Sequence, residues 1–281
     1  MKKIIIGNSG STNKRFNVKK VAVLIPTSKP GNYIEKCLLS IENQTLSKDK
    51  YCVYIGLNGP RFPYENYVLQ VLSKMSFRYK YLYIPKAGVS NARNILIESS
   101  HEDFIVFLDD DDLISENYLE NLLKVSTHEY IGISNIYNFK NNLDNLKENY
   151  IGKTFNFLND GETSKYKIRK YFSPSCGKMI HRNMIGNIKF DEKVSKGEDS
   201  LFMAMISKNV LGIRKTSKDT CYYVHERIGS LTRRKSKISM EIKTNFYLTY
   251  KYLKLLYKKE YDKVFILTRI VATLLKLLKI R

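Results

Sequence analysis

Apolar runs that end at proline, glycine or asparagine alternate with helix-spaced apolar residues over about the first 125 residues, and this alternation limits the fold more than any other feature. Apolar residues at helical spacing follow the first run, in a helix that Asn32 and Glu35 are expected to cap, and a further helix is expected over about Ser90–Ser99. Strands that alternate with helices predict an α/β fold, with a mostly parallel sheet covered on both sides. The runs expected to be strands are Val21–Ile25, Tyr51–Leu57, Tyr79–Ile84 and Phe104–Leu108.

The fourth run ends in four consecutive acidic residues. Phe104–Leu108 has no polar alternation, which is typical of a strand buried on both faces, and it continues directly into Asp109–Asp112. Ligands of such sheets bind at the carboxyl ends of the strands, where this acidic run falls. If strand geometry continued, Asp109 and Asp111 would point to the same side. We therefore expect the ligand site at this edge.

Four neighbouring carboxylates repel one another and raise one another's pKa unless a cation is near. Hard oxygen ligands suit Mg²⁺ or Mn²⁺, which one or two carboxylates and substrate phosphates commonly hold. A solvated loop is the alternative for an isolated Asp run, but the position directly after a buried strand favours a metal site.

The pattern of apolar residues that indicates helices and strands is weaker beyond the acidic run. Ser115 is expected to cap the next helix, and residues 130–166 to form a strand and a long loop over the site. A further helix opens with Glu198-Asp199, where acidic residues could simply favour the positive end of the helix dipole. A strand over Thr220–Val224 then leads to His225.

The chain carries 48 Lys and Arg against 27 Asp and Glu, a formal net charge of +21. Nucleic acid, an anionic membrane or a phosphorylated substrate could each match this charge. From Leu231 to Arg281 there are 14 basic and 3 acidic residues, so much of the excess lies in the tail. The tail has two amphipathic stretches, which predict either helices packed on the domain or helices that lie on an anionic membrane.

The tail's second apolar stretch contains Arg269, Lys276 and Lys279, so it falls short of a membrane span. The four cysteines form no CxxC pair, which favours a reducing compartment. The first residues turn polar from Gly7, before a secretory apolar region develops. We expect a cytoplasmic protein, held at the inner face of the cell membrane if the tail binds lipid.

Six motifs, taken together and in this order, resemble those of the family 2 glycosyltransferases. The resemblance covers about residues 21–234 and implies the GT-A fold, a Rossmann-like nucleotide-binding mixed sheet flanked by helices. It places this domain at residues 1–235 and a basic helical tail at 236–281. The motifs are Val21–Pro26; Tyr33–Ile41 with Asn43-Gln44-Thr45; Gly88–Asn94; Phe107–Asp112; Gly197-Glu198-Asp199; and Gly229–Thr232.

The resemblance implies an inverting glycosyltransferase that uses Mn²⁺ or Mg²⁺ and a nucleotide-sugar, expected to be a UDP-sugar. The acceptor would be a glycan or a lipid-linked intermediate of surface polysaccharide synthesis, and no nucleic acid partner is expected. Asp109-Asp110-Asp111 matches the family's Asp-x-Asp element, in which the first aspartate faces the donor ribose and the last binds the metal. Asp109 and Asp110 are thus expected to contact the donor, and Asp109 and Asp111 the metal.

By the same resemblance, Asp199 matches the general base that removes the acceptor proton. Glu198 beside it would orient the acceptor. Arg93 would lie near the diphosphate or help to hold the Asp run. His225 would close over the diphosphate or complete the metal shell, although a lone histidine is more often structural. The basic residues Arg227, Arg233 and Arg234 could also contact phosphates.

Two positions depart from the family pattern. Asn58 stands where the family commonly has an acidic residue that reads the nucleobase, although an amide can still pair with a uracil edge. After Pro26, the usual aromatic turn is replaced by Thr27–Gly31, so this wall of the base pocket should differ. Pro26, Thr27 and Asn58 are nevertheless expected to contact the donor.

Two other classes of protein fit part of this pattern. A metal-dependent phosphohydrolase or nuclease would use an aspartate cluster, but it should show a second metal site, and the four histidines are not paired at ligand spacing. A non-catalytic nucleic-acid-binding protein would explain the charge and the 21 tyrosines. No helix-turn-helix, zinc or RNA-recognition signature supports it.

Overall fold

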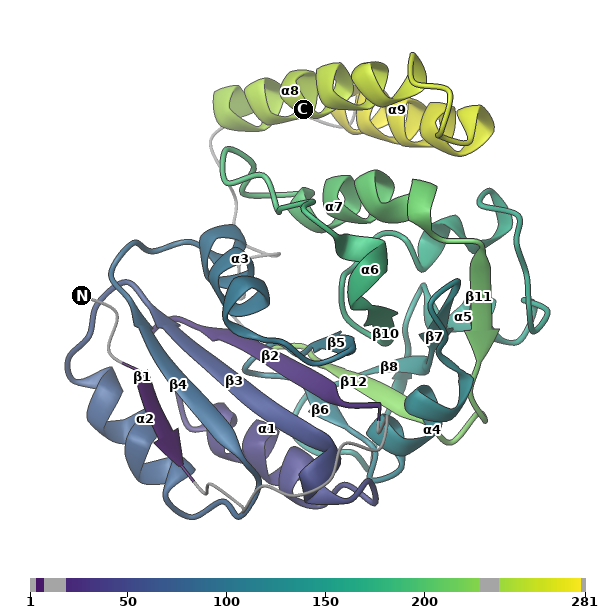
Figure 1. Cartoon of the computed structure of the whole chain (residues 1–281). Coiled ribbons are helices and arrows are strands. Elements are labelled where there is room, and N and C mark those ends of the chain that lie inside the picture. Colours follow the sequence, from purple (N-terminus) through teal and green to yellow (C-terminus); the bar gives the residue numbers. More distant parts are fainter. Residues whose placement is uncertain (1–3, 8–18, 228–237, 279–281) are drawn as a thin grey trace.

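The computed structural model describes residues 4–7, 19–227 and 238–278, which fold around one large mixed sheet (Figure 1). Its strand order is β1-β4-β3-β2-β5-β10-β7-β11. The four neighbours β4, β3, β2 and β5 run parallel, whereas β1 and β10 pair antiparallel with their neighbours. The strands are β1 (Ile4–Gly7), β2 (Val21–Thr27), β3 (Tyr51–Asn58), β4 (Tyr79–Ile84), β5 (Phe104–Phe107), β7 (Tyr130–Ile133), β10 (Lys178–His181) and β11 (Gly212–Lys215).

A smaller sheet lies beside the carboxyl end of β5, with the order β6-β12-β8-β9. Its strands are β6 (Leu113–Ile114), β8 (Asn135–Phe139), β9 (Lys147–Glu148) and β12 (Cys221–His225). Because β12 pairs with β6, which directly follows the acidic run, residues more than a hundred positions apart meet at this edge. The region 130–166 contains β7, β8, β9 and a short helix. It is thus more regular than the predicted strand and long loop.

Helices cover both faces of the main sheet, with α1 and α2 on one face and α3 on the other (Figure 1). The helices are α1 (Tyr33–Glu42), α2 (Tyr64–Leu72), α3 (Val89–Ser99), α4 (Tyr118–Val125), α5 (Gly152–Phe155), α6 (Arg182–Ile185), α7 (Glu198–Ile206), α8 (Ile238–Leu256) and α9 (Lys263–Leu278). Short 3₁₀ turns span Lys48–Lys50, Lys167–Lys170 and Ser207–Asn209.

The predicted strands of the first half are confirmed. Every residue of β2, β3 and β5 is buried, as expected for strands covered on both faces.

Two predicted helix caps are wrong. The Asn32 side chain makes no capping bond to α1, and Glu35, its expected partner in the cap, pairs with Lys74 instead.

The cap predicted for the helix after the acidic run is also wrong, because that helix begins later and a distant side chain serves it. The N-cap of α4 is Asn117, and the Gln44 side chain accepts the Leu119 N–H at 2.9 Å. The Ser115 hydroxyl instead accepts the Cys221 N–H at 2.9 Å. It thereby holds the start of β12 against β6.

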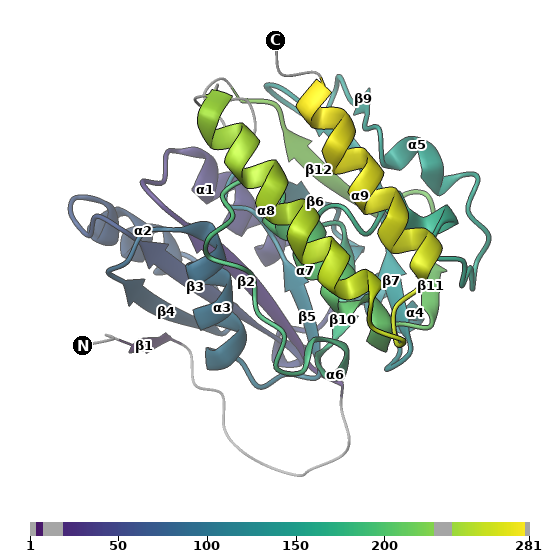
Figure 2. The same ribbon diagram turned by 90° about the horizontal axis from the view of Figure 1, so that it is seen from above.

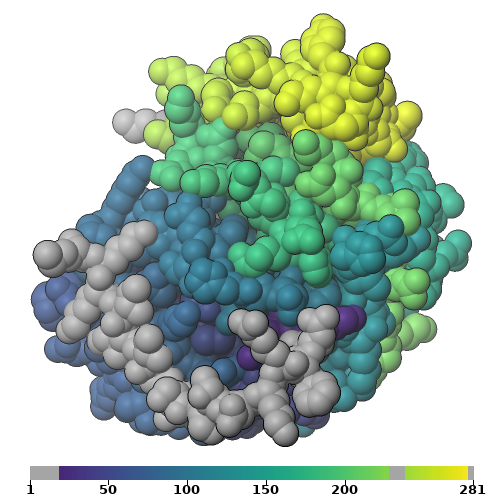
Figure 3. All heavy atoms as spheres, viewed as in Figure 1, coloured from purple at the N-terminus to yellow at the C-terminus, as the bar shows by residue number. Residues whose placement is uncertain are grey.

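The tail forms a helical hairpin in which α8 and α9 lie side by side and cross the molecule above α7 (Figure 2). One side of each helix is buried: Leu248, Tyr252 and Leu255 on α8, with Phe265 and Ile270 on α9. In the space-filling view the hairpin lies along the top of the molecule (Figure 3). Across the described ranges, no helix has both the length and the apolarity needed to cross a membrane. The predicted domain boundary at residue 235 lies outside the described residues.

Candidate functional site

The acidic run turns immediately after β5. The strand ends at Phe107, and the Asp112 N–H donates to the Asp109 carbonyl at 3.1 Å. Strand alternation therefore does not extend through the run, so the condition under which alternation would point Asp109 and Asp111 to the same side is not met. The turn instead spreads the four carboxylates over separate partners.

Each aspartate of the run has its own partner from another part of the chain. Two are paired with arginines and two accept hydrogen bonds from neutral donors. Asp109 binds Arg93 at 2.9 Å, Asp110 accepts the Thr27 hydroxyl, Asp111 pairs with Arg227, and Asp112 accepts the Tyr222 hydroxyl and the His225 N–H, both at 2.7 Å. This distribution reduces the repulsion among four adjacent negative charges.

The run still favours additional positive charge. Burial, with Asp109 and Asp111 nearby, raises the pKa of Asp110 to about 7, even though the Thr27 hydrogen bond opposes the shift. Burial and the Asp109 charge also raise the pKa of Asp111, and they raise that of Asp112 well above its ordinary value. A cation beside these carboxylates would stabilise their charged forms.

The donor set suits a hard divalent ion. Asp109 and Asp111 supply carboxylate oxygens, the ligands that Mg²⁺ and Mn²⁺ prefer. In the part of the chain that the structure describes, no three His, Cys, Asp or Glu side chains are grouped to enclose a metal. An ion here would therefore be held by one or two carboxylates and completed by oxygens of a bound ligand.

Arg93 of α3 joins the acidic run to the Glu198-Asp199 pair. Its side chain is 4% exposed. One guanidinium nitrogen lies 2.6 Å from Asp199 Oδ1 and 4.0 Å from Glu198, and the other lies 2.9 Å from Asp109 Oδ1. The Phe190 ring lies 5.3 Å from the guanidinium carbon. Of the two predicted positions for Arg93, the geometry supports the one that holds the Asp run.

The start of α7 presents Glu198 and Asp199 to this site. Gly197 precedes them with φ of +91°, a left-handed conformation that favours glycine. Asp199 Oδ2 also accepts the Ser175 N–H at 3.2 Å, so both carboxylate oxygens are oriented. Burial and the neighbouring Asp199 charge raise the pKa of Glu198 to about 7. The pair therefore has stronger contacts than the helix dipole alone would provide.

Sequence reasoning missed the loop that holds Asp199. Lys178 is fully buried and donates to the carbonyls of Pro174 and Cys176, both at 2.7 Å, on either side of Ser175. Burial lowers the pKa of this lysine to about 7. No local motif marks Lys178, because its role depends on how the chain folds back toward α7.

The residues predicted for the base pocket brace the ends of β2 and β3. The Asn58 side chain donates to the Thr27 carbonyl at 2.8 Å and accepts the Gly88 N–H at 2.9 Å. Pro26 lies opposite Gly56 where β2 pairs with β3. Asn58 thus fixes the loop that begins α3, and the predicted contacts of these residues with a nucleobase stay predictions.

His225 ends β12 beside the acidic run. Its ring stacks on Phe139 at 4.7 Å between centroids, and Nε2 lies 2.8 Å from the Lys140 carbonyl. In the tautomer that donates from Nε2, Nδ1 keeps its lone pair, and among the described residues this buried atom has no hydrogen-bond partner. Metal ligation by His225 stays a prediction. The Gly229–Thr232 motif, Arg233 and Arg234 lie outside the described residues.

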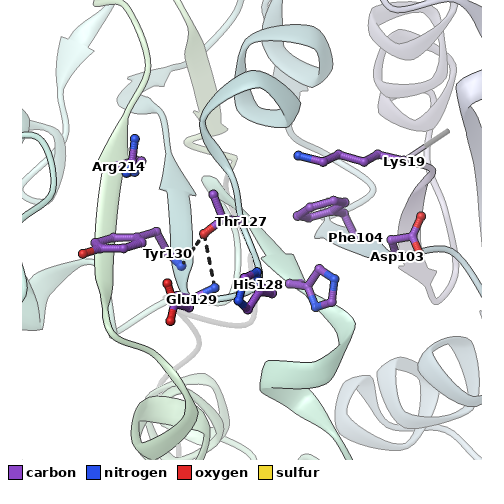
Figure 4. A pocket seen from close by; sticks show the side chains of 9 residues that line it. Lys19, Asp103, Phe104, Thr127, His128, Glu129, Tyr130 and Arg214 are labelled. Atoms are coloured by element: carbon purple, nitrogen blue, oxygen red, sulfur yellow. Dashed lines mark hydrogen bonds between the residues drawn. The ribbon is translucent and has the colours of Figure 1, made fainter. Parts of the chain in front are cut away.

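A separate hollow of about 460 Å³ lies at the ends of the strands away from the acidic run (Figure 4). It is lined by Lys19, Phe104, His128, Tyr130 and Arg214, among others. Phe104 and Tyr130 begin β5 and β7, so this hollow is at the amino ends of these strands. No predicted site residue lines it, which separates it from the acidic site.

The sequence is similar to those of known glycosyltransferases. The family model described as Glycosyl transferase family 2 matches residues 22–188. Glycosyltransferase GlyA of Streptococcus pneumoniae is 28% identical over 229 residues, which are 76% of this chain and 32% of that protein. Poly(ribitol-phosphate) beta-N-acetylglucosaminyltransferase TarS of Staphylococcus aureus is 21% identical over 212 residues, 75% of this chain and 36% of that protein. The chain thus spans about a third of the length of these relatives.

Solved structures show the same fold. The structure of TarS residues 1–349 in complex with UDP-GlcNAc matches with a TM-score of 0.69 and 18% identity, covering 91% of this chain and 71% of that one. The mannosyltransferase PcManGT of Pyrobaculum calidifontis, in complex with GDP-Man and Mn²⁺, matches with a TM-score of 0.59 and 14% identity, covering 95% and 76%.

Proposed function

The chain belongs to glycosyl transferase family 2 and has the GT-A fold, and from this premise we propose that it transfers a sugar from a UDP-sugar to an acceptor hydroxyl with inversion. The observation that carries the proposal is the position of Arg93, which contacts Asp109 on one side and Asp199 on the other. One buried guanidinium thereby contacts both the carboxylate that we assign to the donor and the carboxylate that we assign to the acceptor, which supports a single site for both substrates. Family membership also argues against the phosphohydrolase, nuclease and nucleic-acid-binding alternatives.

On the donor side, Asp109 and Asp111 would hold Mn²⁺ or Mg²⁺ together with the nucleotide diphosphate. When bound, such an ion would neutralise the charge that develops on the diphosphate leaving group. Asp109 and Asp110 would contact the donor beside Thr27, at the end of β2. Arg227, which pairs with Asp111, adds a cation where the phosphates would lie. The Mn²⁺ in the PcManGT complex supports this choice of ion.

On the acceptor side, Asp199 would take the proton from the attacking hydroxyl. The contacts of Asp199 with Arg93 and Ser175 fix the direction of its carboxylate, and each oxygen retains a further lone pair for the acceptor. Glu198 lies next to it and would orient the same hydroxyl. Attack from the side opposite the diphosphate is a single displacement, so the anomeric configuration would invert.

The acceptor class follows from the relatives and from the charge. TarS is named as acting on poly(ribitol-phosphate), a polymer. We propose a glycan or lipid-linked acceptor of surface polysaccharide synthesis for this chain. A net charge of +21 favours an acceptor that carries phosphate. The reaction would take place in the cytoplasm, where nucleotide-sugars are made.

A thermal-shift screen of nucleotide-sugars tests the proposal, because a ligand that binds the native state raises the melting temperature by mass action. We expect one UDP-sugar to raise the Tm with Mn²⁺ or Mg²⁺, and a chelator to abolish both this shift and turnover of that donor. A panel that includes ADP- and GDP-sugars serves as the matched control. Absence of any shift across the panel, or full turnover in chelator, would contradict the proposed donor site.

A further inference from the structure

The helical hairpin α8–α9 has two apolar faces. Its inner face packs on the rest of the molecule through side chains such as Leu248, Tyr252 and Phe265. This packing continues toward the site: Leu248 Cδ1 would lie 3.0 Å from a Cβ placed at Gly197, the residue before Glu198. Arg269 of α9 is buried and donates to the Ser173 hydroxyl at 2.9 Å, next to the loop that holds Asp199. The inner face therefore supports the acceptor side of the site.

The outer face of the hairpin is apolar as well. Along α8, Ile242, Phe246 and Leu253 are exposed at spacings of four and seven residues, so they form one stripe, and the exposed Tyr257 follows directly after the end of the helix. Phe246 is 61% exposed and Tyr257 is 85% exposed. A helix that only covered a domain would carry polar residues here.

The second helix repeats this arrangement beside the first. Val264, Leu267, Val271 and Leu274 of α9 are 41–58% exposed and recur at spacings of three or four residues. The view from above shows the two helices side by side, with the hairpin uppermost (Figure 2). The two stripes therefore combine into one broad apolar surface. A patch of this kind marks an interaction site in a protein.

Lysines border this surface. Lys243 and Lys254 are exposed on α8 and, eleven residues apart, lie along one side of the apolar stripe, and Lys258 is exposed just beyond the end of this helix. Lys276 is exposed near the end of α9. An apolar stripe flanked by lysines has the features of a helix that lies in a membrane interface.

We propose that the outer face of α8–α9 docks on an anionic lipid surface. The apolar side chains would enter the boundary between headgroups and acyl chains, and the lysines would contact lipid phosphates. Charge complementarity favours this partner over a second copy of the chain, because two copies would each bring a net charge of +21 and juxtapose the same lysines. The two predicted roles of the tail are thus divided between its faces, with packing on the inner face and lipid binding on the outer face.

Substitutions on the outer face are a sharper test than removal of the hairpin, since removal would also expose the inner face and disturb α7. The apolar variant combines Phe246→Gln, Leu253→Gln and Val271→Gln. The charge variant combines Lys243→Gln, Lys254→Gln and Lys258→Gln. Matched controls carry the same changes outside the hairpin, at Leu143, Phe157 and Leu211, or at Lys124, Lys147 and Lys218.

Flotation of the full chain with vesicles measures the effect, comparing phosphatidylcholine alone with phosphatidylcholine plus phosphatidylglycerol. We expect binding only to the anionic vesicles, weakened by salt and reduced roughly tenfold or more by either hairpin variant. The matched controls should bind as the wild type does. Circular dichroism and Tm values unchanged from those of the wild type would show that the variants fold.

Three results would overturn the proposal. The first is equal binding to neutral and anionic vesicles, and the second is equal vesicle binding by the wild type and both hairpin variants. The third is a wild-type dimer that the apolar variant dissociates while neither protein binds vesicles, which would assign the outer face to a second copy. Neither readout depends on sugar transfer, so a failure here leaves the proposed function to its own test.

Discussion

The two acidic groups of the site are built in different ways. Asp109–Asp112 follows a buried strand directly, and its four side chains diverge to separate partners. Glu198-Asp199 begins a helix, and distant residues converge on Asp199: Arg93 from α3 and Ser175 from the loop before β10. The first group is thus suited to offer one or two carboxylates to a cation that a polyanionic donor also binds. The second is suited to hold one carboxylate in a fixed direction.

The position of the acidic run depends on the end of one strand, whereas the orientation of Asp199 depends on the assembled fold. A run of acidic residues after a buried strand is visible in the sequence, and its position at the carboxyl edge follows from the parallel sheet. The orientation of Asp199 depends on a loop whose carbonyls are held by the buried Lys178. Four substitutions test whether the two groups have the separate roles proposed for them.

The largest effect is expected from Asp199→Asn. The amide cannot accept a proton as the carboxylate does, so kcat should fall by roughly 10²–10⁴-fold. Donor affinity, measured by calorimetry with Mn²⁺, should stay close to that of the wild type, since Asp199 does not bind the diphosphate in this proposal. Asp144→Asn, in an exposed loop, is the matched control. An unchanged kcat would refute the assignment of the base.

Asp111→Asn tests the acidic run and should affect metal-dependent donor binding. Loss of a charged oxygen ligand should weaken Mn²⁺-dependent donor binding by roughly tenfold or more, because only one or two carboxylates and the donor phosphates would hold the ion. Binding should be measured with and without Mn²⁺, so that the metal-dependent part is isolated. Donor affinity that responds to Mn²⁺ as in the wild type would remove Asp111 from the metal site.

Lys178→Met should give a smaller loss that is confined to the acceptor side. The carbonyls of Pro174 and Cys176 would lose their donor, and the loop that carries Ser175 would no longer hold Asp199 firmly. A misplaced catalytic group lowers turnover, and we expect roughly a tenfold fall in kcat with unchanged donor affinity. Lys165→Met, another lysine that donates to backbone carbonyls, is a suitable control. A parallel loss of donor binding would show that Lys178 supports both groups.

The smallest effect is a pH-dependent change in stability for Glu198→Gln. Because the folded-state pKa of Glu198 is raised from 4.5 to about 7, its protonated form favours folding. That contribution is complete below pH 4.5 and is lost as the pH rises through about 7. The Tm of the variant relative to the wild type should therefore be higher at pH 8 than at pH 5, measured by calorimetry. A difference in Tm that does not vary with pH would contradict the raised pKa.

The sequence predicts the surroundings of the acidic run better than those of Asp199, and the reasons are physical. β2, β3, β4 and β5 are continuous apolar runs with clear stop signals, so their positions follow from local pattern. The second sheet depends on pairing between β12 and β6, which local pattern does not encode. For the same reason local pattern points to Ser115 as the cap of α4, whereas Gln44 supplies the capping contact from across the fold.

The central claim is that the acidic run and the Glu198-Asp199 pair face one bound donor from two sides. A crystal structure with Mn²⁺ and the UDP-sugar selected by the thermal-shift screen tests it most directly. We expect the ion between Asp111 and the diphosphate, with the Asp199 carboxylate directed toward the opposite side of the anomeric carbon. An ion bound elsewhere, or Asp199 directed into a different pocket from Asp111, would contradict it.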